Sequence, residues 1–128
     1  MTAADAATGS ETTGKRVLIV EDESMIRMLL EDMLGDLGYS VTGSVGKLDE
    51  AMALAKETEF DIAILDINLN GQAVSPVADI LDSRGLPYIF ASGYGEQGVP
   101  DSHRDRPLLQ KPFHQEALMK LLADMREQ

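Results

Sequence analysis

The sequence contains no cysteine among its 128 residues. This absence excludes a disulfide framework, a thiolate metal site and a cysteine nucleophile. No apolar run approaches the length of a membrane-spanning helix, and residues 1–14 lack the apolar core of a signal peptide. We therefore expect a cytoplasmic protein that makes no contact with a membrane.

Basic residues are also scarce, because 11 Lys and Arg stand against 22 Asp and Glu and leave a net charge of -11. A surface of this sign repels the phosphates of nucleic acids, so we expect no nucleic-acid partner. The acidic residues either only keep the protein soluble or include a local cluster that binds a cation. Net charge by itself leaves both interpretations open.

The chain does have enough apolar material for one domain, since 44% of its residues are hydrophobic over a length that suits a single core. Residues 1–14 are mainly Ala, Thr, Gly and Ser. Such a segment cannot bury enough apolar area to fold, which predicts a disordered N-terminal tail. The folded domain is expected to cover residues 15–128.

Short apolar runs, several of them rich in β-branched residues, alternate with segments of helical periodicity. Continuous runs of this kind are typical of strands that are buried on both faces of a parallel sheet. The predicted strands are 17–20, 39–42, 60–66, 87–91 and 108–110. Apolar spacing predicts helices at about 24–37, 48–55 and 75–84, and a last helix that opens at Pro112.

Two helix details follow from the same pattern. Ser75 is expected to cap the third helix, with Pro76 in its first turn. The inner face of the last helix is predicted to carry Phe113, Ala117, Leu121, Leu122 and Met125.

The order of the elements is strand then helix, five times, except that glycines and prolines interrupt residues 93–107 where a helix is due. We expect a loop or one marginal helical turn there. Buried strands that alternate with helices imply a parallel sheet covered on both faces. Right-handed crossovers then restrict the topology to a doubly wound α/β sheet of five strands.

Polar side chains follow the predicted strands at the points where the strands end. In an open parallel sheet these carboxyl ends share one edge, at which ligands bind. The residues that should converge there are Glu21, Asp22, Asp66, Ser92 and Lys111. Three close carboxylates repel one another and need a cation, and oxygen ligands without His or Cys select Mg²⁺ or a similar ion.

This set of residue types suits phosphoryl transfer to a carboxylate. One oxygen of Asp66 could attack phosphorus and give an aspartyl phosphate. The cation, Ser92 and Lys111 would then hold the three phosphoryl oxygens. Taken singly, each residue has a plainer interpretation, such as Asp22 or Glu23 as a helix cap. Asp61 and Asp66 bracket one buried strand, so either could be a solvated strand end, but the joint occurrence favours a site.

In this order the motifs resemble the receiver domains of response regulators. Residues 17–23 resemble the family's first strand with its acidic pair, and residues 64–69 resemble its phosphoacceptor strand. Ala91-Ser92-Gly93 matches its Thr/Ser switch position, and Gln110-Lys111-Pro112-Phe113 matches its Lys-Pro-Phe signature. The resemblance covers residue 16 to about residue 127 and implies the flavodoxin-like (βα)5 receiver fold.

The resemblance implies a role for each site residue. Asp66 would be the phosphoacceptor, while Ser92 and Lys111 would contact the phosphoryl group. Asp22 would ligate Mg²⁺ (or Mn²⁺) directly, with Glu21 helping, either directly or through water. Asp66 and the backbone carbonyl of Asn68 would complete the protein ligands. The Lys111–Pro112 peptide is expected to be cis.

Residues 87–95 are similar to a receiver subgroup with a Phe-Ala-Thr-Gly-Tyr motif, found largely as single domains in alphaproteobacteria; Ser92 stands here in place of Thr. That subgroup has an irregular or shortened fourth helix, in agreement with the interrupted residues 93–107. Many receivers carry an aromatic switch residue three positions before the lysine, where this sequence has Leu108. We expect Tyr94 or the segment itself to carry the change, so that phosphorylation orders or repositions it.

The resemblance implies a phosphoacceptor switch of a two-component phosphorelay, not an enzyme. The donor would be a phosphohistidine of a sensor histidine kinase or of a histidine phosphotransfer protein. Because no DNA-binding domain is recognisable, output would be contact with a downstream protein or withdrawal of phosphoryl groups from another regulator. The alternatives are a pseudo-receiver that binds partners without phosphorylation, a haloacid-dehalogenase-type hydrolase, and a small flavodoxin-like ligand binder.

Overall fold

The computed structural model describes residues 15–93, 106–111 and 113–126, without the side chains of residues 125 and 126. The predicted tail, Tyr94 with most of the segment 93–107, and the Lys111–Pro112 peptide lie outside these residues. No helix in the described ranges is long and apolar enough to cross a bilayer.

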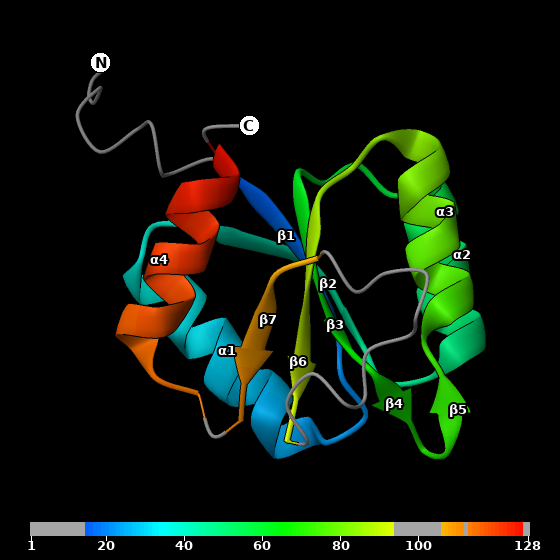
Figure 1. Cartoon of the computed structure of the whole chain (residues 1–128), viewed down its shortest axis with the longest axis horizontal. Helices are drawn as coiled ribbons and strands as arrows, with labels where there is room; N and C mark the ends of the chain where they lie inside the picture. Colours follow the sequence, from blue (N-terminus) through cyan, green and yellow to red (C-terminus); the bar gives the residue numbers. More distant parts are fainter. Residues whose placement is uncertain (1–14, 94–105, 112, 127–128) are drawn as a thin grey trace.

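The described elements alternate as the apolar pattern predicts (Figure 1). The strands of the central sheet are β1 (Arg16–Val20), β2 (Ser40–Val45), β3 (Ile62–Asp66), β6 (Tyr88–Ser92) and β7 (Leu108–Gln110). The helices are α1 (Ser24–Asp36), α2 (Leu48–Glu57), α3 (Ser75–Arg84) and α4 (Gln115–Arg126). A short hairpin of β4 (Asn68–Leu69) and β5 (Gln72–Ala73) lies between β3 and α3.

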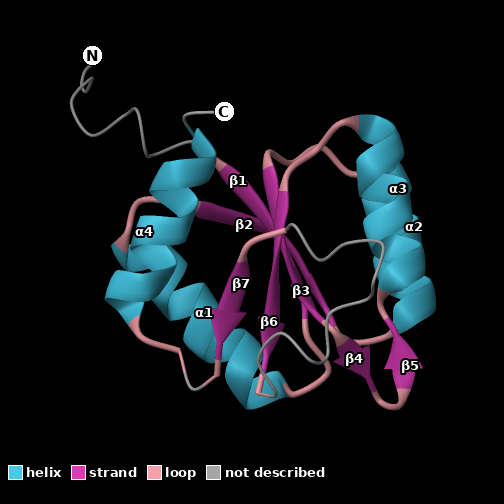
Figure 2. Ribbon diagram, in the orientation of Figure 1, coloured by secondary structure: helices cyan, strands magenta, loops and turns pink. Residues whose placement is uncertain are grey.

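The central sheet is parallel and has the strand order β2-β1-β3-β6-β7. Helices α1 and α4 cover one face of the sheet, and α2 and α3 cover the other (Figure 2). This arrangement confirms the doubly wound, flavodoxin-like fold of five strands. It also leaves the carboxyl ends of the strands along one edge, where the β4–β5 hairpin lies as well.

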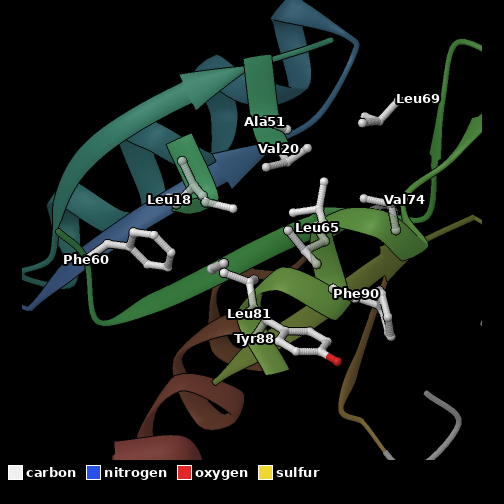
Figure 3. Packing of buried hydrophobic residues seen from close by; sticks show 14 residues of the cluster. Leu18, Val20, Ala51, Phe60, Leu65, Leu69, Val74, Leu81, Tyr88 and Phe90 are labelled. Carbon is white, nitrogen blue, oxygen red and sulfur yellow. The ribbon is translucent and has the colours of Figure 1, made fainter. Parts of the chain in front are cut away.

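The two faces of the sheet carry separate cores, because successive side chains of a strand point to opposite faces. Leu18, Leu65 and Phe90 belong to the core beneath α2 and α3 (Figure 3). Ile19 and Ile89 belong to the core beneath α1 and α4. Every residue of β3 and of β6 is buried, which explains why these strands appear in the sequence as apolar runs up to their polar last residues, Asp66 and Ser92.

Several strand and helix boundaries differ from the predictions. β2 continues to Val45, beyond the predicted end at residue 42, because it pairs with β1 as far as Val20. The added residues include Gly43 and Ser44, which an apolar pattern does not identify as strand. Ser75 is not a cap but the first residue of α3; Val74 occupies the N-cap position, and no side chain caps the helix.

The last helix begins at Gln115 rather than at Pro112, and its inner face differs accordingly. Leu118 and Leu122, which lie one turn apart, are fully buried. Ala117 is exposed, so its predicted place in the core was wrong. The predictions for Leu121 and Leu122 are confirmed, since Leu122 is buried in the core and Leu121 packs against it. Phe113 also belongs to this core, but it precedes α4, so its predicted place on the helix was wrong. The Met125 side chain is outside the described part of the chain.

Candidate functional site

The carboxyl edge of the sheet brings together residues from four strands. Glu21 and Asp22 follow β1, Asp66 ends β3, Ser92 ends β6 and Lys111 follows β7. Their side chains meet because adjacent parallel strands end at the same edge. Apart from the buried Glu21, all of these residues line one open depression of about 420 Å³.

Three carboxylates form a cluster in this depression. Glu21, Asp22 and Asp66 each offer an oxygen, and these oxygens lie within 4.8 Å of one another. Glu21 is 1% exposed and Asp66 is 7% exposed. Burial, and then the charge of Glu21, raise the pKa of Asp66 to about 7, although Lys111 acts in the opposite direction. The cluster is therefore short of positive charge.

Lys111 supplies part of that positive charge. Its Nζ lies 2.9 Å from Oε1 of Glu21 and 3.5 Å from Oδ2 of Asp66. Burial alone would lower the pKa of Lys111, but the two carboxylates raise it above its usual value, so the ammonium stays charged. The backbone N–H of Lys111 also donates to the carbonyl of Ser92 at 2.9 Å, which holds the ends of β6 and β7 together.

The acids after β1 do not act as caps of α1. Glu23 occupies the N-cap position of that helix, yet it makes no side-chain hydrogen bond there. Oδ2 of Asp22 instead accepts the backbone N–H of Asn70 at 3.0 Å. Burial would raise the pKa of Asp22, but hydrogen bonds from neighbouring groups, Asn70 among them, bring it below its usual value. The simple capping interpretation therefore does not describe this loop.

Asp61, at the opposite end of β3, has a structural role. Its Oδ2 accepts the backbone N–H of Arg16 at 2.7 Å and lies 3.3 Å from Nε of the same residue. Of the two acids that bracket β3, only Asp66 lies at the carboxyl edge.

The β4–β5 hairpin belongs to the site and was not predicted. Asn70 and Gly71 form its turn with φ angles of 53° and 88°. Asn-Gly is the sequence that favours a two-residue hairpin turn of this kind, so the signal was present. The backbone N–H of Asn68 lies 3.4 Å from Oδ1 of Asp66, and that of Asn70 bonds Asp22. The hairpin therefore holds two of the three carboxylates from one side.

The donor chemistry of the cluster fits a hard divalent cation. All three clustered side chains are carboxylates, and no histidine joins them in the described part of the chain. Mg²⁺ prefers such oxygen ligands, and its charge would offset both the burial of Asp66 and the charge of Glu21, which together raise the pKa of Asp66. Asn68 lines the same depression and could add a backbone oxygen.

Comparison with known proteins agrees with this geometry. The family model described as response regulator receiver domain matches residues 17–123. Transcriptional regulatory protein PdtaR of Mycobacterium tuberculosis is 33% identical over 103 residues, which cover 77% of this chain and 50% of PdtaR. The chain thus spans about half the length of that relative.

Two solved structures of SdrG extend the similarity to the fold. The solution structure of SdrG from Sphingomonas melonis Fr1 matches with a TM-score of 0.80 and 40% identity, over 90% of this chain and 98% of SdrG. The BeF3-activated conformation of SdrG from Pseudomonas melonis Fr1 matches with a TM-score of 0.74 and 43% identity, over 86% of this chain and 94% of that one. At these identities the similarity concerns sequence as well as fold.

Proposed function

Since this chain belongs to the family of response regulator receiver domains, we propose that it is a phosphoacceptor switch whose acceptor is Asp66. The observation that carries the proposal is the position of the Asp66 carboxylate. It is nearly buried, lies within 4.8 Å of the Glu21 and Asp22 carboxylates, and has the Lys111 ammonium 3.5 Å away. Such a group can receive a phosphoryl group only where cations balance the added charge.

In the proposed reaction, one carboxylate oxygen of Asp66 attacks the phosphorus of a phosphohistidine. The new O–P bond forms as the P–N bond breaks, and the imidazole leaves with the bonding electron pair and takes up a proton. The product is an aspartyl phosphate. The chain contributes placement and charge compensation, which are the main sources of catalysis in phosphoryl transfer.

Mg²⁺, or Mn²⁺ in its place, would be held by Glu21, Asp22, Asp66 and the backbone carbonyl of Asn68. When bound, it would neutralise the carboxylates and the charge on the phosphoryl oxygens. Lys111 would turn from the carboxylates toward one phosphoryl oxygen, and the hydroxyl of Ser92 would donate to another. Ser92 and Lys111 are suited to act together because their backbones are joined by a hydrogen bond of 2.9 Å.

The proposed donor is a sensor histidine kinase or a histidine phosphotransfer protein. Output would be contact with a downstream protein or withdrawal of phosphoryl groups from another regulator, without turnover of a substrate. The similar protein SdrG has a conformation described as BeF3-activated. That description supports a switch that responds to a phosphoryl-like group.

The test uses acetyl phosphate as a small donor, with Mg²⁺ present, and the mass of the intact protein as the readout. We expect a phosphoryl adduct in the wild type that is lost in Asp66→Asn. Asp61→Asn is the matched control because it removes the other acid that flanks β3, and it should keep the adduct. An unmodified wild type would instead support a pseudo-receiver, and steady phosphate release with many turnovers would support a hydrolase.

A further inference from the structure

Arg27 contacts the acidic loop from α1, and the proposed reaction does not use its charge. Its Nη1 donates to the backbone carbonyl of Glu21 at 2.7 Å. That carbonyl belongs to the peptide between Glu21 and Asp22, two of the three clustered carboxylates. A hydrogen bond from a guanidinium is charge-assisted, so it holds this peptide more firmly than a neutral donor would.

Gly46 makes room for this contact. A Cβ atom at Gly46 would lie 2.5 Å from Nη1 of Arg27, 3.1 Å from the carbonyl oxygen of Glu21 and 3.2 Å from Cα of Asp22. The first distance is far too short for unbonded atoms, and the other two contacts are with backbone, which yields less readily than a side chain. Any side chain at this position would displace the guanidinium or the acidic loop.

Gly46 is itself fixed relative to the loop. It directly follows Val45, whose carbonyl accepts the backbone N–H of Glu21 at 2.9 Å. The peptide of Glu21 is thus held on its N–H side by the end of β2 and on its carbonyl side by Arg27, while Asn70 holds the carboxylate of Asp22. The arrangement fixes both the backbone and a side chain of the acidic pair.

We propose that Arg27 and Gly46 act as one positioning unit that sets the affinity of the carboxylate cluster for Mg²⁺. The inference rests on the proposed function, because it concerns the metal that the acceptor site would hold. Mg²⁺ demands near-ideal octahedral geometry, so a small displacement of the Glu21–Asp22 peptide weakens binding. Groups that orient metal ligands from behind typically change metal affinity by about 10- to 100-fold when removed.

The test is the Mg²⁺ affinity itself, measured by isothermal titration calorimetry and by NMR chemical-shift titration with no phosphodonor present. We expect Arg27→Gln and Gly46→Ala each to weaken Mg²⁺ binding by about 10-fold. The double variant should bind no more weakly than the weaker single variant, because either change already removes the same contact.

Two control variants match these changes at positions that make none of the contacts to the acidic loop described above. Arg84 also donates to backbone carbonyls, reaching Ala55 at 2.5 Å and Thr58 at 3.1 Å, but it lies at the end of α3 that is opposite the site. Gly43 lies in β2, and a Cβ there would meet Leu18 Cδ1 at 2.9 Å in the core. Arg84→Gln and Gly43→Ala should lower stability and leave the affinity for Mg²⁺ unchanged.

The outcomes separate this inference from the proposed function. A wild type that does not bind Mg²⁺ would overturn both. Three other outcomes would overturn the positioning unit alone. Arg27→Gln and Gly46→Ala could bind Mg²⁺ as tightly as the wild type, or lose no more Mg²⁺ affinity than the control variants do. The losses of Mg²⁺ affinity in the two single variants could also add up in the double variant. Circular dichroism identifies any variant that fails to fold. If Arg27→Gln does not fold, Arg27→Lys replaces it, because lysine keeps the charge but lacks the planar guanidinium. Arg27→Lys should also bind Mg²⁺ more weakly than the wild type.

Discussion

The partly buried Lys111 ammonium and the buried Glu21 carboxylate form an ion pair, with 2.9 Å between Nζ and Oε1. Glu21 is 1% exposed, so the loss of its partner would leave a negative charge buried beside Asp66. We expect Lys111→Gln to lower the free energy of unfolding in EDTA by about 3 kcal/mol, as seen when one partner of a buried pair is removed. Urea denaturation measures this loss.

Lys120→Gln is the control for that prediction, because Lys120 is exposed on α4. It should change the free energy of unfolding by less than about 0.5 kcal/mol. Equal stability of the Lys111 and Lys120 variants would show that the Glu21 charge does not depend on Lys111. The Lys111 variant should also retain less of the phosphoryl adduct, because one phosphoryl oxygen loses its ammonium partner.

Asp66 makes the metal-free protein less stable as the pH rises. Its folded pKa of about 7 lies above the value of about 3.9 that an unfolded chain gives, so the folded state binds the proton more tightly. The protonated Asp66 side chain therefore contributes its full share of the unfolding free energy below about pH 4, and this share is lost as the pH rises toward about 7. A shift of this size corresponds to at most about 4 kcal/mol of unfolding free energy.

We accordingly expect Asp66→Asn to be more stable than the wild type at about pH 8 in EDTA, although it removes the proposed acceptor. The difference should shrink toward about pH 5, and Mg²⁺ should stabilise only the wild type. Chemical denaturation at both pH values, with and without Mg²⁺, measures these effects. A destabilised Asp66→Asn protein at the higher pH would mean that the fold does not disfavour the ionised form of Asp66, either through burial or through the charge of Glu21.

Asp61 has the opposite pH dependence. Burial would raise its pKa, but the backbone N–H and guanidinium of Arg16 lower it below the usual value. The ionised Asp61 side chain therefore stabilises the fold at pH values above its pKa in the unfolded chain. This stabilisation is lost as the pH falls through its pKa in the folded protein. Asp61→Asn should lower the free energy of unfolding by about 1 kcal/mol at neutral pH, since the ion pair with Arg16 is partly exposed. It should not change the free energy of unfolding at a pH where the wild-type Asp61 carboxyl is protonated. A cost that persists in acid would contradict this ion pair.

The positions of Asp66, Ser92 and Lys111 could be predicted because parallel topology alone determines them. Each residue ends or follows a buried apolar run, and adjacent parallel strands end at one edge. The period of an apolar run is a local property, so the strands and their ends are visible in the sequence. The fold class then determines which side chains lie together at this edge.

The hydrogen bond of Arg27 to the Glu21 carbonyl, in the space that Gly46 leaves open, could not be predicted in this way. Arg27 occupies an ordinary position in α1, and its partner depends on how closely the end of β2 approaches the acidic loop. No local pattern encodes that approach. The exposure of Ala117 has a similar cause, because the inner face of α4 is set by its start at Gln115 and by docking on the sheet. The hairpin turn at Asn70-Gly71, in contrast, is a local feature that the Asn-Gly sequence itself indicates.

Three apolar side chains on α1 are exposed beside the acidic loop, where a protein that donates a phosphoryl group to the proposed acceptor would have to approach. Met25, Met28 and Leu29 are 80%, 62% and 43% exposed and share one face of the helix. An exposed apolar group of this kind often marks a protein contact. Met28→Lys should slow phosphoryl transfer from a phosphorylated histidine phosphotransfer protein about 10-fold or more and leave phosphorylation by acetyl phosphate unchanged. Met119→Lys, on α4, should alter neither rate, and equal slowing with both donors would place the defect in the site itself.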